Sequence, residues 1–257
     1  MTMETTLSLI LACITLATPM GIGVEANSPS AAELTAAITQ PAVAAESSMP
    51  VARVAARPQE TAPDSAAAIL ERAASAYRDA ITLRSNFLQE IRIPALDEEK
   101  TGRGVVYQKK PNFFLMKFDE PEGDIVVADG EWFWMYYPSA QPDQVIRTAM
   151  ARVPEAATLG GDFLVDPTER YVATYVEKSQ VTKRPAHLIA LVPKFEAPYT
   201  LVRVWVDAED FLVRSFEIHE ENGTIRTLTL SDMETGVDLP DDLFTFTPPS
   251  GVEVFTR

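Results

Sequence analysis

Side chains able to do acid–base or metal chemistry are few in this chain and lie far apart. The sequence has two histidines, His187 and His219, and one cysteine, Cys13. Metal sites and histidine-dependent catalytic sites require several such residues at short, fixed spacings. The sequence contains no such cluster and no Gly-rich phosphate loop after a strand. We therefore expect both histidines to be half-exposed strand residues, with no metal and no cofactor.

Adjacent carboxylates occur at Glu220-Glu221 and Asp241-Asp242, each beside an expected turn. Acid pairs at turns are usually solvated, whereas a glycosidase pair must face across a cleft, which a sequence does not display. The sequence therefore favours a protein without catalytic residues. A hydrolase that uses serine or carboxylates near a lipid is the enzymatic alternative.

The net charge excludes one class of partner, and the N-terminus indicates the compartment. The 257 residues carry a formal charge of −15, which argues against nucleic acid as a partner because phosphate backbones require a basic surface. An apolar run at Leu7–Ala17 and a small-residue site before residue 27 predict a signal peptide over residues 1–26 and export to the periplasm. A signal peptide usually begins with basic residues, but residues 1–26 contain no Lys or Arg. The alternative is that the segment is not cleaved and stays as an anchor.

Residues 27–64 form an Ala/Pro-rich stretch, with eleven Ala, five Pro and no aromatic residue. Such a composition buries too little apolar area to offset the ordering entropy of the chain, which predicts a disordered linker. The first aromatic residue is Tyr77. We therefore expect one folded domain over residues 65–257, and a monomer.

The domain is expected to open with a helix and continue as strands. Asp64 or Ser65 is a suitable N-cap for a helix reaching about Ala80. Period-two alternation then predicts strands. These are Arg84–Ile93, Gly102–Gln108, Phe113–Phe118, Asp124–Ala128, Glu131–Tyr137, Tyr171–Lys178, Arg184–Val192, Tyr199–Val206, Phe211–Glu220, Thr224–Asp232 and a short closing strand. Gln141–Arg147 is a candidate for one more.

The stretch Lys109–Pro138 is the most aromatic part of the sequence. An Asp-Gly pair between apolar runs is a strong signal of a two-residue hairpin turn, which would place Val127 opposite Trp132 and Ile125 opposite Trp134. One face of this hairpin is then uncharged. We expect that face to point inward; it consists of Ile125, Val127, Trp132, Trp134 and Tyr136.

After Pro138 the alternation stops. Met150, Val153, Ala157 and Leu159 are spaced as in a short helix that ends at Gly160-Gly161. Together the patterns predict a mainly β fold: one large, curved antiparallel sheet of ten or eleven strands, forming an open half-barrel, with helices as a lid over an apolar cavity. A flat sheet of this size would expose too large an apolar face.

Several short motifs resemble the LolA family of outer-membrane lipoprotein carriers. They are Lys-Pro-Asn-Phe-Phe at 110–114, Pro121, the run IVVADGEWFWMYYP at 125–138 and the ending FTFTPPSGVEV at 244–254. The resemblance covers about residues 66–257. It implies a periplasmic carrier that takes triacylated lipoproteins from an inner-membrane ABC transporter complex and delivers them to an outer-membrane receptor.

The resemblance also suggests roles for individual residues. Phe114 corresponds to a family aromatic residue near the cavity mouth, and Lys110 to an Arg that holds the lid closed. Lysine lacks the rigid five-donor fork of arginine, so a weaker latch is expected. The expected lipid-binding residues are Phe114, Met116, Phe118, Ile125, Val127, Trp132 and Trp134. The alternatives on the same fold are a lipid- or lipoprotein-sensing regulator and a carrier of a free lipid or glycolipid.

Overall fold

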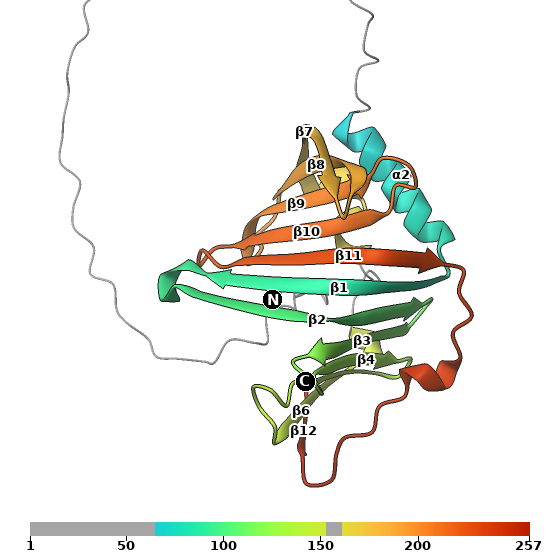
Figure 1. Ribbon diagram of the computed structural model, residues 1–257, viewed down its shortest axis with the longest axis vertical. Coiled ribbons are helices and arrows are strands. Elements are labelled where there is room, and N and C mark those ends of the chain that lie inside the picture. The colour runs from blue at the N-terminus through green and yellow to red at the C-terminus, as the bar shows by residue number, and fades with distance from the viewer. Residues whose placement is uncertain (1–64, 153–160) are drawn as a thin grey trace, which may run out of the picture. The chain divides into compact units, whose positions relative to one another are not determined.

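The structure is a computed structural model that describes residues 65–152 and 161–257, and in these residues a single twelve-stranded sheet dominates (Figure 1). The expected signal peptide, the expected linker and most of the expected helix after Pro138, from Val153 onward, lie outside the described residues. The strands are β1 Thr82–Ile93, β2 Glu98–Lys109, β3 Phe113–Glu120, β4 Ile125–Asp129, β5 Trp132–Tyr136, β6 Gln144–Ala149, β7 Tyr171–Val181, β8 Arg184–Pro193, β9 Tyr199–Asp207, β10 Val213–Glu220, β11 Ile225–Thr235 and β12 Glu253–Thr256.

The helical elements are short apart from the first. They are α2 Ala66–Asp79, η1 Pro94–Leu96, η2 Met150–Arg152, α3 Gly161–Leu164, α4 Pro167–Arg170 and η3 Asp241–Phe244. The mainly β prediction is confirmed, and the helix expected after Ser65 is present.

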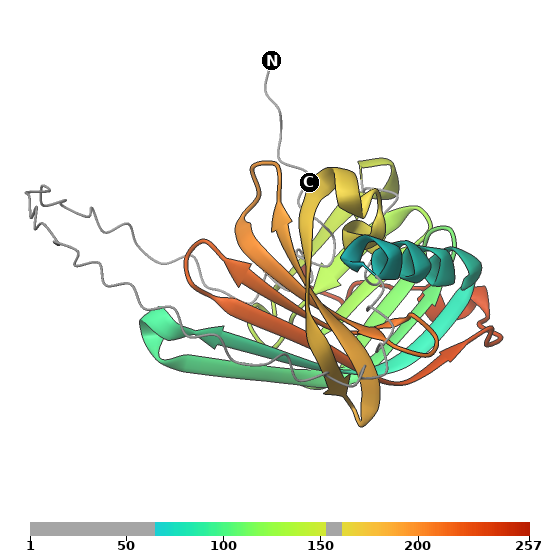
Figure 2. The same ribbon diagram turned by 90° about the horizontal axis from the view of Figure 1, so that it is seen from above.

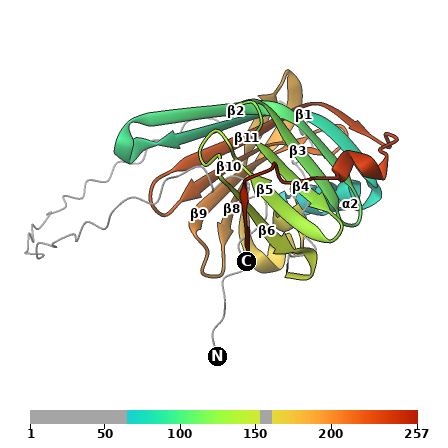
Figure 3. The ribbon, with the colours of Figure 1, turned by 90° about the horizontal axis from the view of Figure 1, so that it is seen from below.

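The sheet has the order β12-β6-β5-β4-β3-β2-β1-β11-β10-β9-β8-β7. Strands β1 to β6 form one meander, and β7 to β11 form a second that returns to the other side of β1. The sheet ends at β7 and β12 in the described residues, so it is open, and it curves around the helices (Figures 2 and 3). One expectation fails at an edge: β12 pairs with β6 in parallel, not antiparallel.

Helix α2 begins where the sequence predicts, because the Ser65 side chain accepts a hydrogen bond from the main-chain N–H of Ala68 at 3.2 Å. Its apolar residues recur at helical spacing, and Ile69, Leu70 and Ala73 are fully buried. The helix contacts α3, α4, β7 and β9. Burial of each large side chain of this kind stabilises the docked helix by roughly 1.5–3 kcal/mol.

The face of the sheet that packs against α2 is called the inner face. Its side chains form one cluster with α2 and α3, which includes Phe87, Phe114, Phe216, Leu228 and Leu230. The opposite, outer face carries a second cluster under the chain segment between β11 and β12, residues 236–252, which is called the strap. Strap residues Leu239 and Phe244 are buried against this outer cluster.

The hairpin between β4 and β5 has a different register from the predicted one. Val127 lies opposite Trp134, and Ala128 opposite Phe133, so the connection is four residues long. Asp129 explains the difference, because its carboxylate accepts hydrogen bonds from the main-chain N–H groups of Glu131 (2.9 Å) and Trp132 (2.7 Å). The shift equals two residues, so every side chain keeps the face that the sequence predicts.

The prediction that Ile125, Val127, Trp132, Trp134 and Tyr136 point inward is wrong. Val127 and Trp134 are buried in the outer cluster, and the other three pack against it. Their neighbours Val126, Ala128, Phe133 and Met135 belong to the inner cluster. The physical reason is that both faces are covered: α2 covers the inner face, and the strap covers the outer face.

Candidate lipid-binding face

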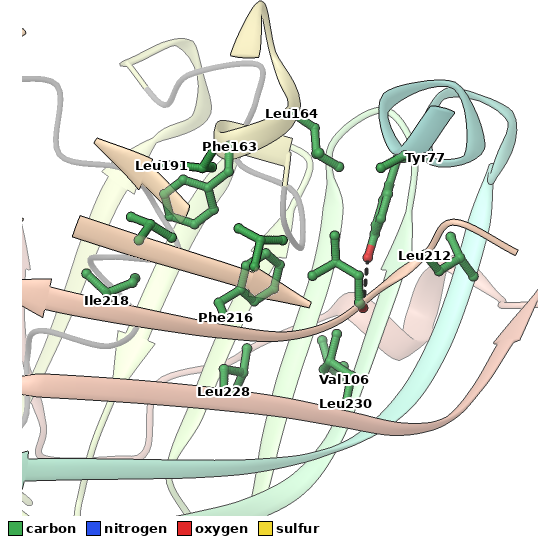
Figure 4. Close-up of a cluster of buried hydrophobic side chains, with 14 of the residues drawn as sticks. Tyr77, Val106, Phe163, Leu164, Leu191, Leu212, Phe216, Ile218, Leu228 and Leu230 are labelled. Carbon is green, nitrogen blue, oxygen red and sulfur yellow. Dashed lines mark hydrogen bonds between the residues drawn. The ribbon is translucent and has the colours of Figure 1, made fainter. Parts of the chain in front are cut away.

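The inner face is a continuous apolar surface built from both meanders and closed by α2 and α3. Figure 4 shows Phe216 and Ile218 of β10 and Leu228 and Leu230 of β11 beneath Tyr77 of α2 and Phe163 of α3. Phe163, Phe216, Ile218 and Leu230 are 0% exposed. Because the protein's own side chains fill this face, an acyl chain can reach it only if the helices move.

Three of the sequence-predicted site residues lie on the inner face. Phe114, Met116 and Phe118 are alternate residues of β3, and each belongs to the inner cluster. The Phe118 ring meets the Phe87 ring edge-on, with centroids 4.9 Å apart. Methionine is unbranched and adapts its shape to its neighbours, so Met116 can pack against more than one arrangement of the side chains around it.

The other four predicted site residues, Ile125, Val127, Trp132 and Trp134, lie on the outer face. Trp134 packs on Phe246 of the strap, with ring centroids 5.6 Å apart, and Arg147 lies 4.0 Å above the Trp132 ring. Since the sheet separates the two groups, the seven residues do not form one site. A lipid-binding role for these four residues stays a prediction, and it is separate from the binding of a lipid to the inner face.

Helix α2 is held over the inner face by two polar contacts with the start of β10 and the loop before it. The Tyr77 hydroxyl donates to the main-chain oxygen of Val213 at 3.5 Å (Figure 4), and the Arg72 guanidinium lies 3.7 Å from the centre of the Phe211 ring. Burial raises the pKa of Tyr77 far above its ordinary value. These contacts place the C-terminal half of α2 against β10.

Lys110 holds the C-terminal end of α2. Its ammonium donates to the main-chain oxygen of Tyr77 and, at 3.1 Å, to that of Arg78. Carbonyl groups at a helix C-terminus have no partner within the helix and attract cations. Burial lowers the pKa of Lys110, while Asp79 opposes and Arg78 adds to this effect. The position matches the latch that the sequence suggests, and its effect on lid opening stays a prediction.

The preceding lysine makes the corresponding contact on the other face. Lys109 donates to the main-chain oxygen of Leu239 at 2.7 Å and to the Asp241 carboxylate at 2.6 Å, both in the strap. Lys109 is the last residue of β2, and Lys110 is the first residue of the turn that follows it. The Lys109-Lys110 pair therefore fixes the strap on one side of the sheet and α2 on the other.

Sequence reasoning missed two buried carboxylates that pair with arginine. Asp207 is fully buried between Arg184 and Arg214. Its burial would raise the pKa of this carboxyl, but hydrogen bonds from Arg184, from the Glu209 and Asp210 main chain and from Arg214 hold it well below the usual range. The second pair, Arg226 with Glu220, lies on the inner face with both side chains at least nine-tenths buried. Neither pairing can be predicted from the spacing of residues in the sequence, because the partners meet across turns and strands.

The histidines agree with the expectation of ordinary strand residues. His219 contacts the Glu217 carboxylate at 2.7 Å, and the His187 ring lies 5.9 Å from that of Tyr175. Within residues 65–152 and 161–257, no group of three or more His, Cys, Asp or Glu side chains could hold a metal ion. The helices in these same ranges are all too short or too polar to cross a membrane.

Comparisons with known proteins agree with this architecture. Residues 78–247 match the family model "Outer membrane lipoprotein carrier protein LolA". An outer-membrane lipoprotein carrier protein of Alkalilimnicola ehrlichii is 27% identical over 182 residues, which cover 69% of this chain and 79% of that protein. The corresponding protein of Haemophilus ducreyi is 29% identical over 171 residues, covering 66% and 76%.

A solved structure is also similar. The LolA superfamily protein NE2245 of Nitrosomonas europaea is 18% identical, with 71% of this chain and 98% of that chain covered and a TM-score of 0.38. The family match itself includes β1 to β11, together with the end of α2 and most of the strap. This chain therefore belongs to the LolA family of outer-membrane lipoprotein carrier proteins.

Proposed function

We propose that this protein is a non-enzymatic periplasmic carrier that binds the acyl chains of lipoproteins on its inner face. It receives them from an inner-membrane ABC transporter complex and delivers them to an outer-membrane receptor. The observation that carries the proposal is an apolar inner face covered by a helix that few polar contacts hold in place. The family and the names of the relatives supply the lipoprotein as cargo.

A carrier must bind its cargo tightly and still release it. Burial of acyl chains yields about 0.8 kcal/mol per CH₂ group, so three fully enclosed chains would exceed the practical limit of roughly 20 kcal/mol for a non-covalent complex. In this protein the cargo competes with α2 for the inner face. The free energy lost when α2 leaves Phe216, Leu230 and their neighbours reduces the net affinity to a level that permits delivery.

Phe114 provides the test of this proposal. In a Phe114→Glu variant, the charge is placed on the apolar inner face, where an unpaired carboxylate is strongly unfavourable. We expect purified variant to lose binding of a synthetic triacylated lipopeptide by at least about tenfold. Titration of a fluorescent lipopeptide measures the affinity, and urea unfolding checks the fold.

Phe113 offers the matched control, since it is the adjacent residue of β3 and packs against Phe244 on the outer face with ring centroids 5.3 Å apart. Phe113→Ala should lower stability without loss of lipopeptide affinity, and Phe114→Ala should weaken the affinity. Equal affinities of Phe113→Ala and Phe114→Ala would exclude the inner face as the binding site.

The identity of the bound cargo distinguishes a lipoprotein carrier from the two alternatives on this fold, a free-lipid carrier and a sensor. Native mass spectrometry of protein purified from its own periplasm should show a bound triacylated lipoprotein. A free lipid or glycolipid in its place would replace the lipoprotein as cargo and keep the inner face as the site. A complex with a signalling protein, with affinity that changes upon lipid addition, would instead support a sensor.

A further inference from the structure

A row of polar side chains crosses the inner face from β1 to β7, which is half of the sheet. The row consists of Gln89 of β1, Arg226 of β11, Glu220 of β10, Tyr199 of β9 and Tyr171 of β7. Arg226 pairs with Glu220, and the hydroxyls of Tyr171 and Tyr199 lie 2.9 Å apart. All five side chains are buried or nearly so, and this set is called the polar row.

Strand register shows that the row is continuous on the inner face. Arg226 lies opposite Ile91, which follows Gln89 by two residues and so shares its face. Glu220 lies opposite Tyr199 on the other side of β10. Tyr171 reaches Tyr199 across β8. The row therefore lies at one end of β11, β10, β9 and β7, and Gln89 lies inside β1.

The row lies at the end of β10 opposite to the contact with α2. Tyr77 bonds to Val213 at one end of β10, and Glu220 is at the other. At about 3.3 Å per residue, the inner face between them is roughly 20 Å long. An extended acyl chain spans half the hydrocarbon thickness of a bilayer, about 15 Å. One chain therefore fits along this face with its linkage to the head group at the polar row.

Gln89 differs from the rest of the row. Its side chain is only 6% exposed, and its Oε1 atom has no hydrogen-bond donor in the part of the chain that the structure describes. Buried amide oxygens nearly always have a donor. Its cross-strand neighbours are Gly102 and Leu228, and neither of their side chains carries a donor. The Phe118 ring and the main-chain oxygen of Glu120 approach Gly102 on this side, and neither of them is a donor.

We propose that the polar row binds the linkage region of the cargo and that Gln89 Oε1 accepts a hydrogen bond from an amide N–H that joins an acyl chain to its head group. The row would then select N-acylated lipids over lipids with only ester linkages. The Arg226–Glu220 pair is neutral as a whole, which fits an uncharged linkage. This inference rests on the proposed function, since it presumes acyl chains on the inner face.

Two probes that differ in one group test the inference. They are the methyl ester of N-palmitoylglycine and its ester analogue, in which oxygen replaces the amide N–H. Displacement of an apolar fluorescent dye from the full-length protein measures both affinities. One hydrogen bond to a buried acceptor predicts that the wild-type protein prefers the amide by roughly 3- to 10-fold. A ratio near one would overturn the proposal.

Variants assign the preference to Gln89. Gln89→Met keeps the size of the side chain and removes the acceptor, so the preference for the amide should disappear. Leu88→Met changes the adjacent residue of β1, whose side chain is 41% exposed on the outer face, and should keep the wild-type ratio. A Gln89→Met protein that still prefers the amide would refute the role of Gln89.

The wild-type ratio needs no variant, so it decides the case even if Gln89→Met fails to fold. Failure of the proposed function gives a different result. If neither probe nor the triacylated lipopeptide displaces the dye, the inner face does not bind acyl chains at all. If the lipopeptide binds and neither probe does, the inner face still binds acyl chains, but the polar row does not recognise an isolated acyl amide, and the inference is wrong.

Discussion

Replacement of Lys110 by methionine should loosen α2 without unfolding the sheet. The variant keeps the length of the side chain and removes the ammonium that donates to the main-chain oxygens of Tyr77 and Arg78. A hydrogen bond from a charged donor contributes about 1.5–3 kcal/mol when buried. Lys110 is half-buried, so solvent weakens both bonds, and we take about 1–2 kcal/mol for the pair. The equilibrium constant for release of α2 should then rise roughly 5- to 30-fold.

Hydrogen exchange followed by mass spectrometry measures this directly on the α2 amides. The peptide over Ile69–Asp79 should exchange faster in Lys110→Met by that factor, and the strands of the second meander should exchange as in the wild type. Lys110→Arg should stay close to the wild type, because guanidinium also donates to carbonyl oxygens. Lys109→Met is the matched control, since the two hydrogen bonds of the Lys109 ammonium go to Leu239 and Asp241 of the strap. Equal exchange of α2 in Lys110→Met and Lys109→Met would refute the latch.

Two further predictions concern stability. Burial raises the pKa of Tyr77 far above the ordinary 10.0, so above about pH 10 the unfolded chain loses this proton and the folded chain keeps it. The free energy of unfolding should therefore fall as pH rises through this range, by up to ~1.4 kcal/mol per pH unit from this group, and Tyr77→Phe should show a smaller fall in urea titrations at about pH 9 to 11; equal slopes would contradict the assignment. Gly104→Ala should abolish folding or cost more than about 3 kcal/mol, because its Cβ would lie 1.9 Å from the main-chain oxygen of Lys117. Gly102→Ala, whose nearest neighbour is the Phe118 ring at 3.0 Å, should cost less, and the same loss for both would argue against the backbone clash.

Local patterns carry most of the fold. The N-cap at Ser65, the strand alternation and the Asp-Gly signal each depend on residues within a few positions, and each produced an element of the predicted type. The hairpin register was wrong by two residues because Asp129 uses its side chain, rather than a two-residue turn, to close the loop. Even so, a shift of two preserves the face of every residue.

Which face of a strand points toward α2 depends on contacts between distant parts of the chain. In β4 and β5 both faces are apolar, with Val127 and Trp134 on one and Val126 and Met135 on the other. Neither polarity nor period decides which one meets α2. The outer face is set by the strap, which covers it and lies more than 90 residues further along the chain. The buried pair Arg226–Glu220 escaped prediction for the same reason.

The two faces also explain how the protein can open without unfolding. A carrier that releases α2 exposes its inner face and gives up part of the cluster that includes Phe216 and Leu230. The outer cluster does not depend on α2: Trp134 and its neighbours pack against the strap, and Lys109 secures the strap from the same turn that holds Lys110. We therefore expect strands β3 to β6 to keep their pairing while α2 is released. Lys109 and Lys110 adjoin in sequence and contact opposite sides of the sheet, so the lid and the strap share one anchor. We expect opening to break the Lys110 contacts together with those of Tyr77 and Arg72, and to leave the Lys109 contacts in place.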